Sequence, residues 1–412
     1  MKEAWIPTRT KSRKPGRIGR GEGRLIIGRR ALLGVLAAVG AAGWLPPPAL
    51  GADSILWTNS SSGEVRIGNL DGTGSPQSLF TGQTTASGGA INPVTGKLYW
   101  GAGPGEIQVG NLDGTGAKTL IPGQNTPIDV AIDPAGGKVY WTNYNISQIM
   151  GANLDGTGIK VLFGELTTTA GLAIDPAAGK IYWDGFTNPG NAPAIRFGNI
   201  DGSGSAQTLY TGPGVTSPVG LAIDHAAGKI YWSNQAISGQ VEVANLAGTT
   251  PVPVPLYTGE SYPEGLAVDP AAGKIYWATN SAIRIGNLNG NGSPTNVFGG
   301  ESGPDRPALL RSPAGAGAPQ ISGGSSGAPL SCSQGAWASD LVGAYLYRAP
   351  QSFSYQWTLR GADIGGATGS SYSPTSGGSY ACRVTATNFA GATAQTSGPH
   401  RSSVPRPASR FR

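Results

Sequence analysis

Six tryptophans recur at nearly constant spacing in the middle of the chain. Their separations are 43, 41, 42, 49 and 45 residues, and all but the first directly follow a tyrosine. The six are Trp57, Trp100, Trp141, Trp183, Trp232 and Trp277. A repeat of this length has the size of one four-stranded propeller blade. The spacing therefore predicts an all-β ring of repeated sheets.

Each repeat divides into four short segments with the composition of strands. Typical examples of the four, in order, are residues 265–269, 274–277, 282–288 and 208–211. An Asp-Pro-Ala-Ala-Gly turn joins the first two, and an Asn-Leu-Asp-Gly-Thr-Gly turn joins the last two. Proline presets φ in the first turn, and Asp-Gly favours a tight hairpin in the second. We expect the residues that open the first turns to cap them: Asn92, Asp133, Asp175, Asp224 and Asp269.

The two ends of the array complement each other. The first copy begins at residues 54–57 with a second strand, so its first strand is missing. Residues 307–313, after the last copy, align with residues 264–270, which include a first strand. We predict that 307–313 supply the innermost strand of the first sheet, which would leave no unpaired sheet edge. The fold predicted for 53–313 is a β-propeller of six complete blades.

These repeats resemble the YWTD (lipoprotein-receptor class B) six-bladed β-propeller family. The resemblance rests on the tandem Ala-Ile-Asp-Pro-Ala-Ala-Gly-Lys-Ile-Tyr-Trp runs and the Asn-Leu-Asp-Gly-Thr-Gly turns. The last motif position departs from the family, since Asn59, Asn143 and Asn234 replace aspartate and Ala278-Thr279 follows Trp277. The resemblance implies the fold. It leaves the function open, because one fold hosts many functions.

A second module follows a short linker predicted over 314–318. Cys332, Trp357 and Cys382 stand 25 residues apart, and Tyr380 precedes the second cysteine by two residues. This pattern resembles an immunoglobulin-like β-sandwich, in which tryptophan packs on a disulfide between the sheets. The resemblance covers 319–397 and implies a Cys332–Cys382 bond. The basic tail, 398–412, is predicted to be disordered.

Residues 1–52 have the character of an export signal. A cationic stretch precedes 15 apolar residues over 31–45, too few for an ordinary membrane span. Arg29-Arg30-Ala31-Leu32-Leu33 resembles a twin-arginine signal, with general secretory export as the alternative. The expected location is therefore secreted or in the extracytoplasmic cell envelope, with no membrane span in the mature chain.

Charge and histidine content restrict the possible functions. Residues 53–313 hold 12 Lys and Arg against 19 Asp and Glu, which argues against nucleic-acid binding. The only histidines are His225, which replaces proline in an Asp-Pro turn, and His400 in the tail. A histidine base or metal ligand is therefore disfavoured, and we predict a binding protein without cofactor rather than an enzyme. The alternatives left open are a metal-dependent hydrolase or lyase in the propeller channel, calcium held by oxygen ligands, and a purely structural surface protein with no discrete ligand.

The connections between strands differ in how much they vary. In a propeller, the turns after strands one and three share one face, here nearly constant in sequence and called the turn face. The loops after strands two and four share the other, and they differ between repeats; we call this the variable face. Loops whose sequence the fold does not constrain can carry residues for binding. We therefore predict that this face binds a protein or carbohydrate at the cell surface. The candidate residues are Asn143, Tyr144, Asn145, Asp184, Phe186, Asn188, Glu260, Tyr262, Asp305 and Arg306.

Overall fold

The computed structural model describes residues 52–164, 169–187, 190, 192–248, 253–324 and 328–403. The predicted export signal lies outside these ranges apart from Ala52, as do Asn188 and residues 404–412. Strands dominate the described ranges. No helix within them is long and apolar enough to cross a membrane.

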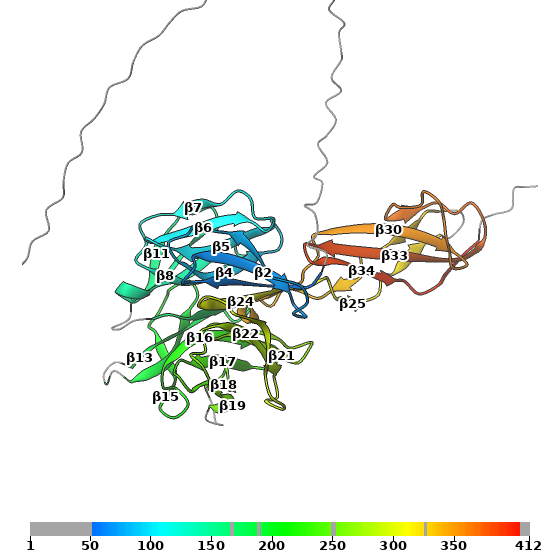
Figure 1. Ribbon diagram of the computed structural model, residues 1–412. Coiled ribbons are helices and arrows are strands. Elements are labelled where there is room, and N and C mark those ends of the chain that lie inside the picture. The colour runs from blue at the N-terminus through cyan, green and yellow to red at the C-terminus, as the bar shows by residue number, and fades with distance from the viewer. Residues whose placement is uncertain are drawn as a thin grey trace, which may run out of the picture. The chain divides into compact units, whose positions relative to one another are not determined.

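Strands β1 to β24 form a ring of six sheets (Figure 1), five with four strands and a first one to which β29 (Leu346–Tyr347) adds a fifth. The first sheet contains β24 (Pro304–Leu310), β1 (Ser54–Asn59), β2 (Glu64–Asn69) and β3 (Gln77–Phe80). The second contains β4 (Ala86–Asn92), β5 (Lys97–Ala102), β6 (Glu106–Asn111) and β7 (Lys118–Ile121). The third contains β8 (Pro127–Asp133), β9 (Lys138–Asn143), β10 (Gln148–Asn153) and β11 (Lys160–Gly164).

The remaining three sheets repeat this order. The fourth contains β12 (Leu172–Asp175), β13 (Lys180–Phe186), β14 (Pro193–Asn199) and β15 (Gln207–Thr211). The fifth contains β16 (Pro218–Asp224), β17 (Lys229–Asn234), β18 (Gly239–Asn245) and β19 (Val254–Glu260). The sixth contains β20 (Leu266–Asp269), β21 (Lys274–Ala278), β22 (Ala282–Asn287) and β23 (Thr295–Gly299).

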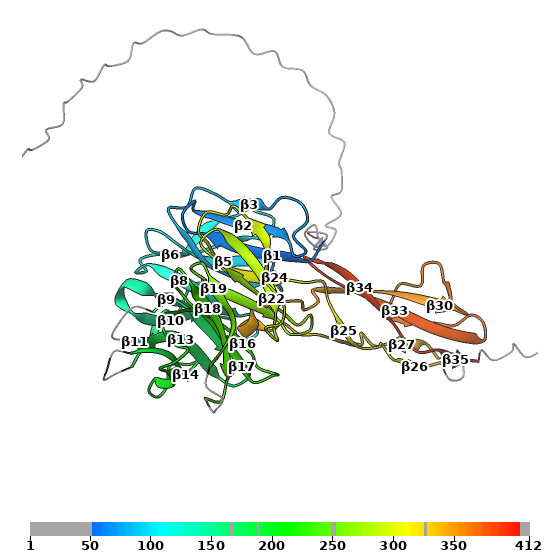
Figure 2. The same cartoon turned by 60° about the horizontal axis from the view of Figure 1, so that its bottom comes forward.

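The late strand β24 closes the ring. It pairs antiparallel with β1, with Leu310 opposite Ser54 and Leu309 opposite Ile55 (Figure 2). It also contacts β20 on one side and β4 on the other, so the innermost strands follow one another without a break. The pairing predicted for 307–313 is confirmed, although the strand runs from Pro304 to Leu310.

Among the described residues, stacked aromatic side chains join every sheet except the third to the one before it. Trp100 stacks on Phe80 with ring centroids 4.7 Å apart, and Trp183 stacks on Phe163 at 4.9 Å. A Cβ atom on Gly198 would lie 2.3 Å from the Phe163 ring, so the third strand needs glycine where this ring approaches. The tryptophans are fully buried, and the prediction that they form the core between sheets is confirmed.

The repeated turns are held by their own side chains. The Asp133 Oδ1 atom accepts the Gly136 N–H at 2.9 Å, and Asn92, Asp175, Asp224 and Asp269 accept equivalent bonds from the N–H three residues on. In the other turn, Asp71 accepts both the hydroxyl and the N–H of Thr73, at 2.7 and 2.9 Å. The hydroxyl and the N–H of Thr73, in that order, lower the pKa of Asp71. The predicted caps are therefore confirmed, and the Asp-Gly turn uses its carboxylate for its own closure.

The C-terminal module is built from short strands and two longer ones. Its strands are β25 (Gly315–Gly317), β26 (Ile321–Gly323), β27 (Leu330–Cys332), β28 (Ala336–Trp337), β29 (Leu346–Tyr347), β30 (Ser352–Leu359), β31 (Ala362–Asp363), β32 (Ser371–Tyr372), β33 (Gly378–Asn388), β34 (Gly391–Thr396) and β35 (His400–Ser402). Cys332 and Cys382 form a disulfide, and buried Trp357 belongs to the same cluster. The Tyr380 hydroxyl donates to the Ser376 carbonyl at 2.5 Å.

Two boundary predictions for this module are wrong. The supposed linker over 314–318 contains β25, which pairs with β28. The tail predicted as disordered from 398 contains β35, which pairs with β33. Main-chain pairing, together with a Ser402 hydroxyl bond to the Gly324 carbonyl, holds the basic segment in place. Local composition did not reveal these long-range partners.

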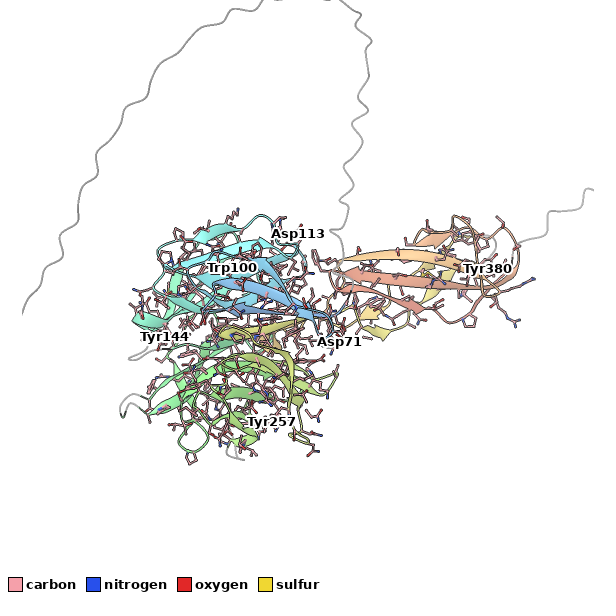
Figure 3. All side chains as sticks on the ribbon, in the orientation of Figure 1. Asp71, Trp100, Asp113, Tyr144, Tyr257 and Tyr380 are labelled. Carbon is pink, nitrogen blue, oxygen red and sulfur yellow. A yellow bond between two sulfur atoms is a disulfide. The ribbon has the colours of Figure 1, made fainter. Side chains whose placement is uncertain are left out.

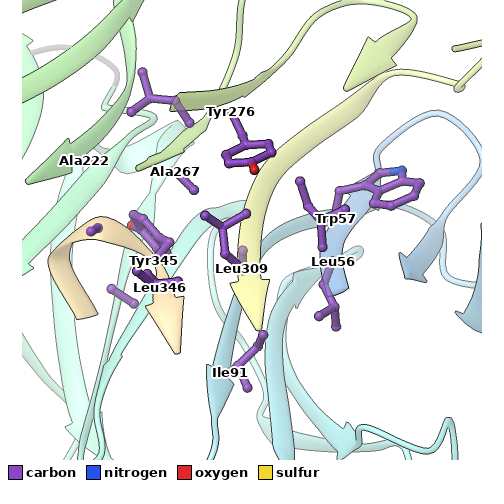
Figure 4. Close-up of a cluster of buried hydrophobic side chains, with 14 of the residues drawn as sticks. Leu56, Trp57, Ile91, Ala222, Ala267, Tyr276, Leu309, Tyr345 and Leu346 are labelled. Carbon is purple, nitrogen blue, oxygen red and sulfur yellow. The ribbon is translucent and has the colours of Figure 1, made fainter. Parts of the chain in front are cut away.

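One hairpin of the C-terminal module enters the core of the ring. This channel hairpin (residues 341–347) contains the 3-10 helix η3 (Val342–Ala344) followed by β29. β29 runs parallel to β24, with Leu346 beside Leu309 (Figure 4). Tyr345 is 3% exposed, and its hydroxyl donates to the Leu172 carbonyl at 2.5 Å. The hairpin therefore fills the channel from the turn face.

A buried acid in the fifth sheet interrupts a repeated ion pair. In the first and sixth sheets the residue opposite the tryptophan is an arginine paired with a glutamate, as in Arg284 and Glu260 at 3.1 Å. In the fifth sheet Glu242 takes the arginine position opposite Trp232. Among the described residues its Oε2 atom has no hydrogen-bond partner. Burial raises the pKa of Glu242 to about 7, against a smaller lowering by Asn234.

We expect Glu242→Gln to stabilise the protein above pH 7. A carboxyl group whose pKa is higher in the folded than in the unfolded state favours folding at pH values below its unfolded-state pKa. This contribution to stability is lost as the pH rises toward 7. The variant should gain about 1–2 kcal/mol over the parent at pH 8, allowing for solvent screening, and little at pH 4. Urea unfolding at both pH values measures this difference. A pH-independent difference would contradict the account.

Candidate functional site

Every sheet has a residue at the mouth of the channel on the variable face, either within its innermost strand or just before it. The six are Ser87, Ile128, Ala170, Val219, Glu264 and Arg306. They line a cavity of 290 Å³, which we call the mouth cavity. Tyr144, from a loop of this face, also lines it, and Figure 3 shows Tyr144 at the opposite end of the sheets from Asp71 and Asp113. Glu264 and Arg306 are the charged members of an otherwise small or apolar ring.

A buried charge cluster forms the floor of the mouth cavity. Arg306 is 4% exposed, and its Nε atom lies 3.5 Å from Asp129 Oδ1 and 3.6 Å from Asp305 Oδ1. The Nη1 atom of Arg306 donates to the Val219 carbonyl at 3.1 Å. Asp129 accepts the Leu172 N–H at 2.8 Å, and Glu264 accepts a bond from the side-chain amide of Gln235. Three carboxyl groups thus surround one guanidinium group.

The pKa values of these groups reflect burial and mutual charge. Burial raises the pKa of Asp129 to about 7, with Arg306 opposing it. Burial and the charge of Asp305 raise the pKa of Glu264 to about 7, again against Arg306. Burial alone would lower the pKa of Arg306, but Asp129, Asp305 and Glu264 outweigh it and raise that pKa. Because the acids outnumber the arginine, a positively charged group entering the cavity would stabilise their ionised forms.

The structure brings part of the predicted site together. Tyr144, Asp305 and Arg306 all line the mouth cavity. Asn145 is exposed beside them, and its side-chain amide donates to the Thr126 hydroxyl at 2.6 Å. Tyr262 is 41% exposed on another loop of the same face. Tyr144, Asn145 and Tyr262 are accessible around the channel, whereas Asp305 and Arg306 are buried below them.

The other candidates have structural duties. Asp184 is buried, and its carboxylate accepts the backbone N–H groups of Ala170 and Gly171. Asn143 is buried and contacts Gln124 and Asn125, while Glu260 binds Trp277 and Arg284. Phe186 is half-buried at the end of β13. Asn143, Asp184 and Glu260 therefore hold their own loops and strands rather than face an entering ligand.

Sequence reasoning missed Asp129, Glu264 and Gln235. The available signal was a break in the repeat: Asp129 occupies the inner-strand position where other repeats carry Gly171, Gly220 and Gly265. Exposed apolar residues on the variable face were missed as well, since Ile146 and Ile237 are 44% and 75% exposed. Within the described ranges, no group of three or more His, Cys, Asp or Glu side chains is arranged to hold a metal ion.

Comparisons with known proteins support the fold alone. No family model matches the sequence, and no curated protein matches it. A chain of the nidogen/laminin complex superposes with a TM-score of 0.54 at 19% identity, covering 63% of this chain and 98% of that one. TolB from Acinetobacter baumannii superposes with a TM-score of 0.49 at 16% identity, covering 62% of this chain and 66% of that one. A putative TolB from Agrobacterium tumefaciens superposes with a TM-score of 0.45 at 15% identity, covering 61% of this chain and 91% of that one. The first of these likenesses agrees with the ring of sheets: the chain contains a β-propeller.

Proposed function

We propose that this chain is an exported six-bladed propeller of the YWTD type with an immunoglobulin-like module, which binds a protein partner through its variable face. The mouth cavity carries this proposal. It combines an opening of 290 Å³ with a cluster of buried charges that the scaffold turns do not need. Its excess of carboxyl groups suits a partner that presents a lysine or arginine side chain.

Exposed apolar residues surround this charged centre. Ile146, Ile237 and Tyr262 are 44%, 75% and 41% exposed and belong to three loops of the variable face. The Tyr262 N–H donates to the Ala236 carbonyl at 2.7 Å, which ties two of these loops together. Apolar side chains on pre-ordered loops around a polar centre suit a protein interface, because they can be buried with little loss of conformational entropy.

Partner capture with matched surface variants tests the proposal. Purified residues 53–412 would be crosslinked to intact source cells beside the triple variant Ile146→Ser, Ile237→Ser, Tyr262→Ser. We expect at least about tenfold less of one specific partner to be recovered with the variant.

The control changes equally exposed apolar residues elsewhere on the ring. Ile159, Val161 and Val254 are 46%, 50% and 48% exposed, away from the variable-face loops. Their triple serine variant should recover the partner as the parent does. Equal recovery by both triple variants, or loss with the control alone, would place the interface elsewhere.

A further inference from the structure

A second cavity lies on the turn face, between the propeller and the channel hairpin. Its volume is 530 Å³, within the range of small-molecule sites. Pro134 and Pro176 of two successive turns form one side, and Leu341 and Val342 of the hairpin form the other. It shares no lining residue with the mouth cavity. We call it the hairpin cavity.

The polar groups of the hairpin cavity are mainly acidic. Asp133, Asp175 and Asp340 line it, together with His225. His225 stands where the preceding turn has Pro176, and its Nδ1 atom lies 2.7 Å from the Asp175 carboxylate. The imidazole thus contacts one carboxylate, while the other two also face a largely apolar space.

Asp340 belongs to the hairpin side of the cavity. Its Oδ1 atom accepts the backbone N–H groups of Arg348 and Ala349, at 2.6 and 2.7 Å. The Arg348 side chain does not line the cavity, and its Nε atom donates to the Ser339 carbonyl at 3.0 Å. Asp340 is therefore fixed in position by backbone bonds that an asparagine could also accept.

We propose that the hairpin cavity binds a small amphiphile with an apolar body and a positively charged amine. The apolar body would lie against the turn prolines, Ile174 and Ile223 on one side and Val342 on the other. The carboxylates of Asp133 and Asp340 would attract the amine. They would repel an anionic head group of the same size. A cavity of this volume accommodates an alkyl chain of about eight carbons. This site is independent of the protein-binding function proposed for the variable face.

Titration calorimetry with two probes of equal length tests the charge assignment. Residues 53–412 would be titrated with octylammonium and with octanoate at pH 7, below the concentrations at which either forms micelles. We expect octylammonium to bind at least about tenfold more tightly than octanoate. Asp340→Asn, which keeps an oxygen for the backbone bonds, should weaken octylammonium binding about threefold or more. Equal or tighter binding of octanoate, or no binding of octylammonium, would overturn the proposal.

A pair of matched variants locates the binding. Ala177 is exposed on a turn that lines the hairpin cavity, and Ala271 takes the same place in the turn between β20 and β21, outside it. Ala177→Phe would fill the cavity, so octylammonium binding should fall at least about tenfold. Ala271→Phe should leave binding unchanged. Unchanged binding by Ala177→Phe, or equal losses in both variants, would overturn the assignment of this cavity.

Discussion

A chain that runs from residue 52 and ends at residue 303 will lose the cooperative unfolding transition of the full chain. This truncation removes β24, all seven residues of which are buried, and exposes the edge of β1. Truncating Leu309 or Leu310 to alanine alone costs about 2–5 kcal/mol at a buried site. Domains are typically stable by only about 5–15 kcal/mol, so losing the whole strand exceeds what the ring can tolerate. Urea unfolding followed by tryptophan fluorescence measures the effect.

A chain that ends at residue 318 provides the control. It keeps β24 but lacks the channel hairpin and the rest of the C-terminal module. We expect it to unfold cooperatively at a lower urea concentration than the full chain. If the chain ending at 303 unfolded as cooperatively and at the same urea concentration as this control, β24 would not be the strand that closes the ring.

The ring could be predicted because the residues that form each sheet and its turns lie within a single repeat. The Asp175 cap, the Tyr182-Trp183 pair and the Asp201 turn lie within one stretch of chain, and each is satisfied by near neighbours or by the adjacent sheet. The closing strand was also predictable, since residues 307–313 repeat a pattern already seen in 264–270. Periodicity therefore carries information about contacts that are far apart in sequence.

The candidate site was only partly predictable. Position on the variable face suggested Tyr144, Asp305 and Arg306, which line the mouth cavity, and their role in binding remains a prediction. It also suggested Asp184, which turns inward to bind backbone N–H groups, because a loop assignment does not give the direction of a side chain. Asp129 was missed because it lies within a strand that resembles scaffold, and burial beside Arg306 becomes visible only in three dimensions.

The channel hairpin could not be predicted from local sequence. Its Leu-Val-Gly-Ala-Tyr-Leu-Tyr segment is apolar, as a strand of the C-terminal module would be, and its hydrogen-bond partner Leu172 lies 173 residues from Tyr345. Gly343 of the hairpin packs closely against β12, so that a Cβ atom on it would lie 2.4 Å from the Ile174 carbonyl oxygen. Such a contact results from the packing of one module against the other, and the repeat pattern contains no information about that packing.

Tyr345 should therefore matter for the stability of the ring rather than for its own module alone. Tyr345→Ala removes a buried ring from the channel, and we expect it to lower the free energy of unfolding by about 3–5 kcal/mol. Tyr345→Phe keeps the ring and loses only the bond to the Leu172 carbonyl, which should cost about 1 kcal/mol. Hydrogen exchange adds a local readout: amides of β12 should exchange faster in the alanine variant, while those of β7, which is outermost in its sheet, should not change. Loss of stability confined to the C-terminal module, with unchanged exchange in β12, would contradict the role assigned to the hairpin.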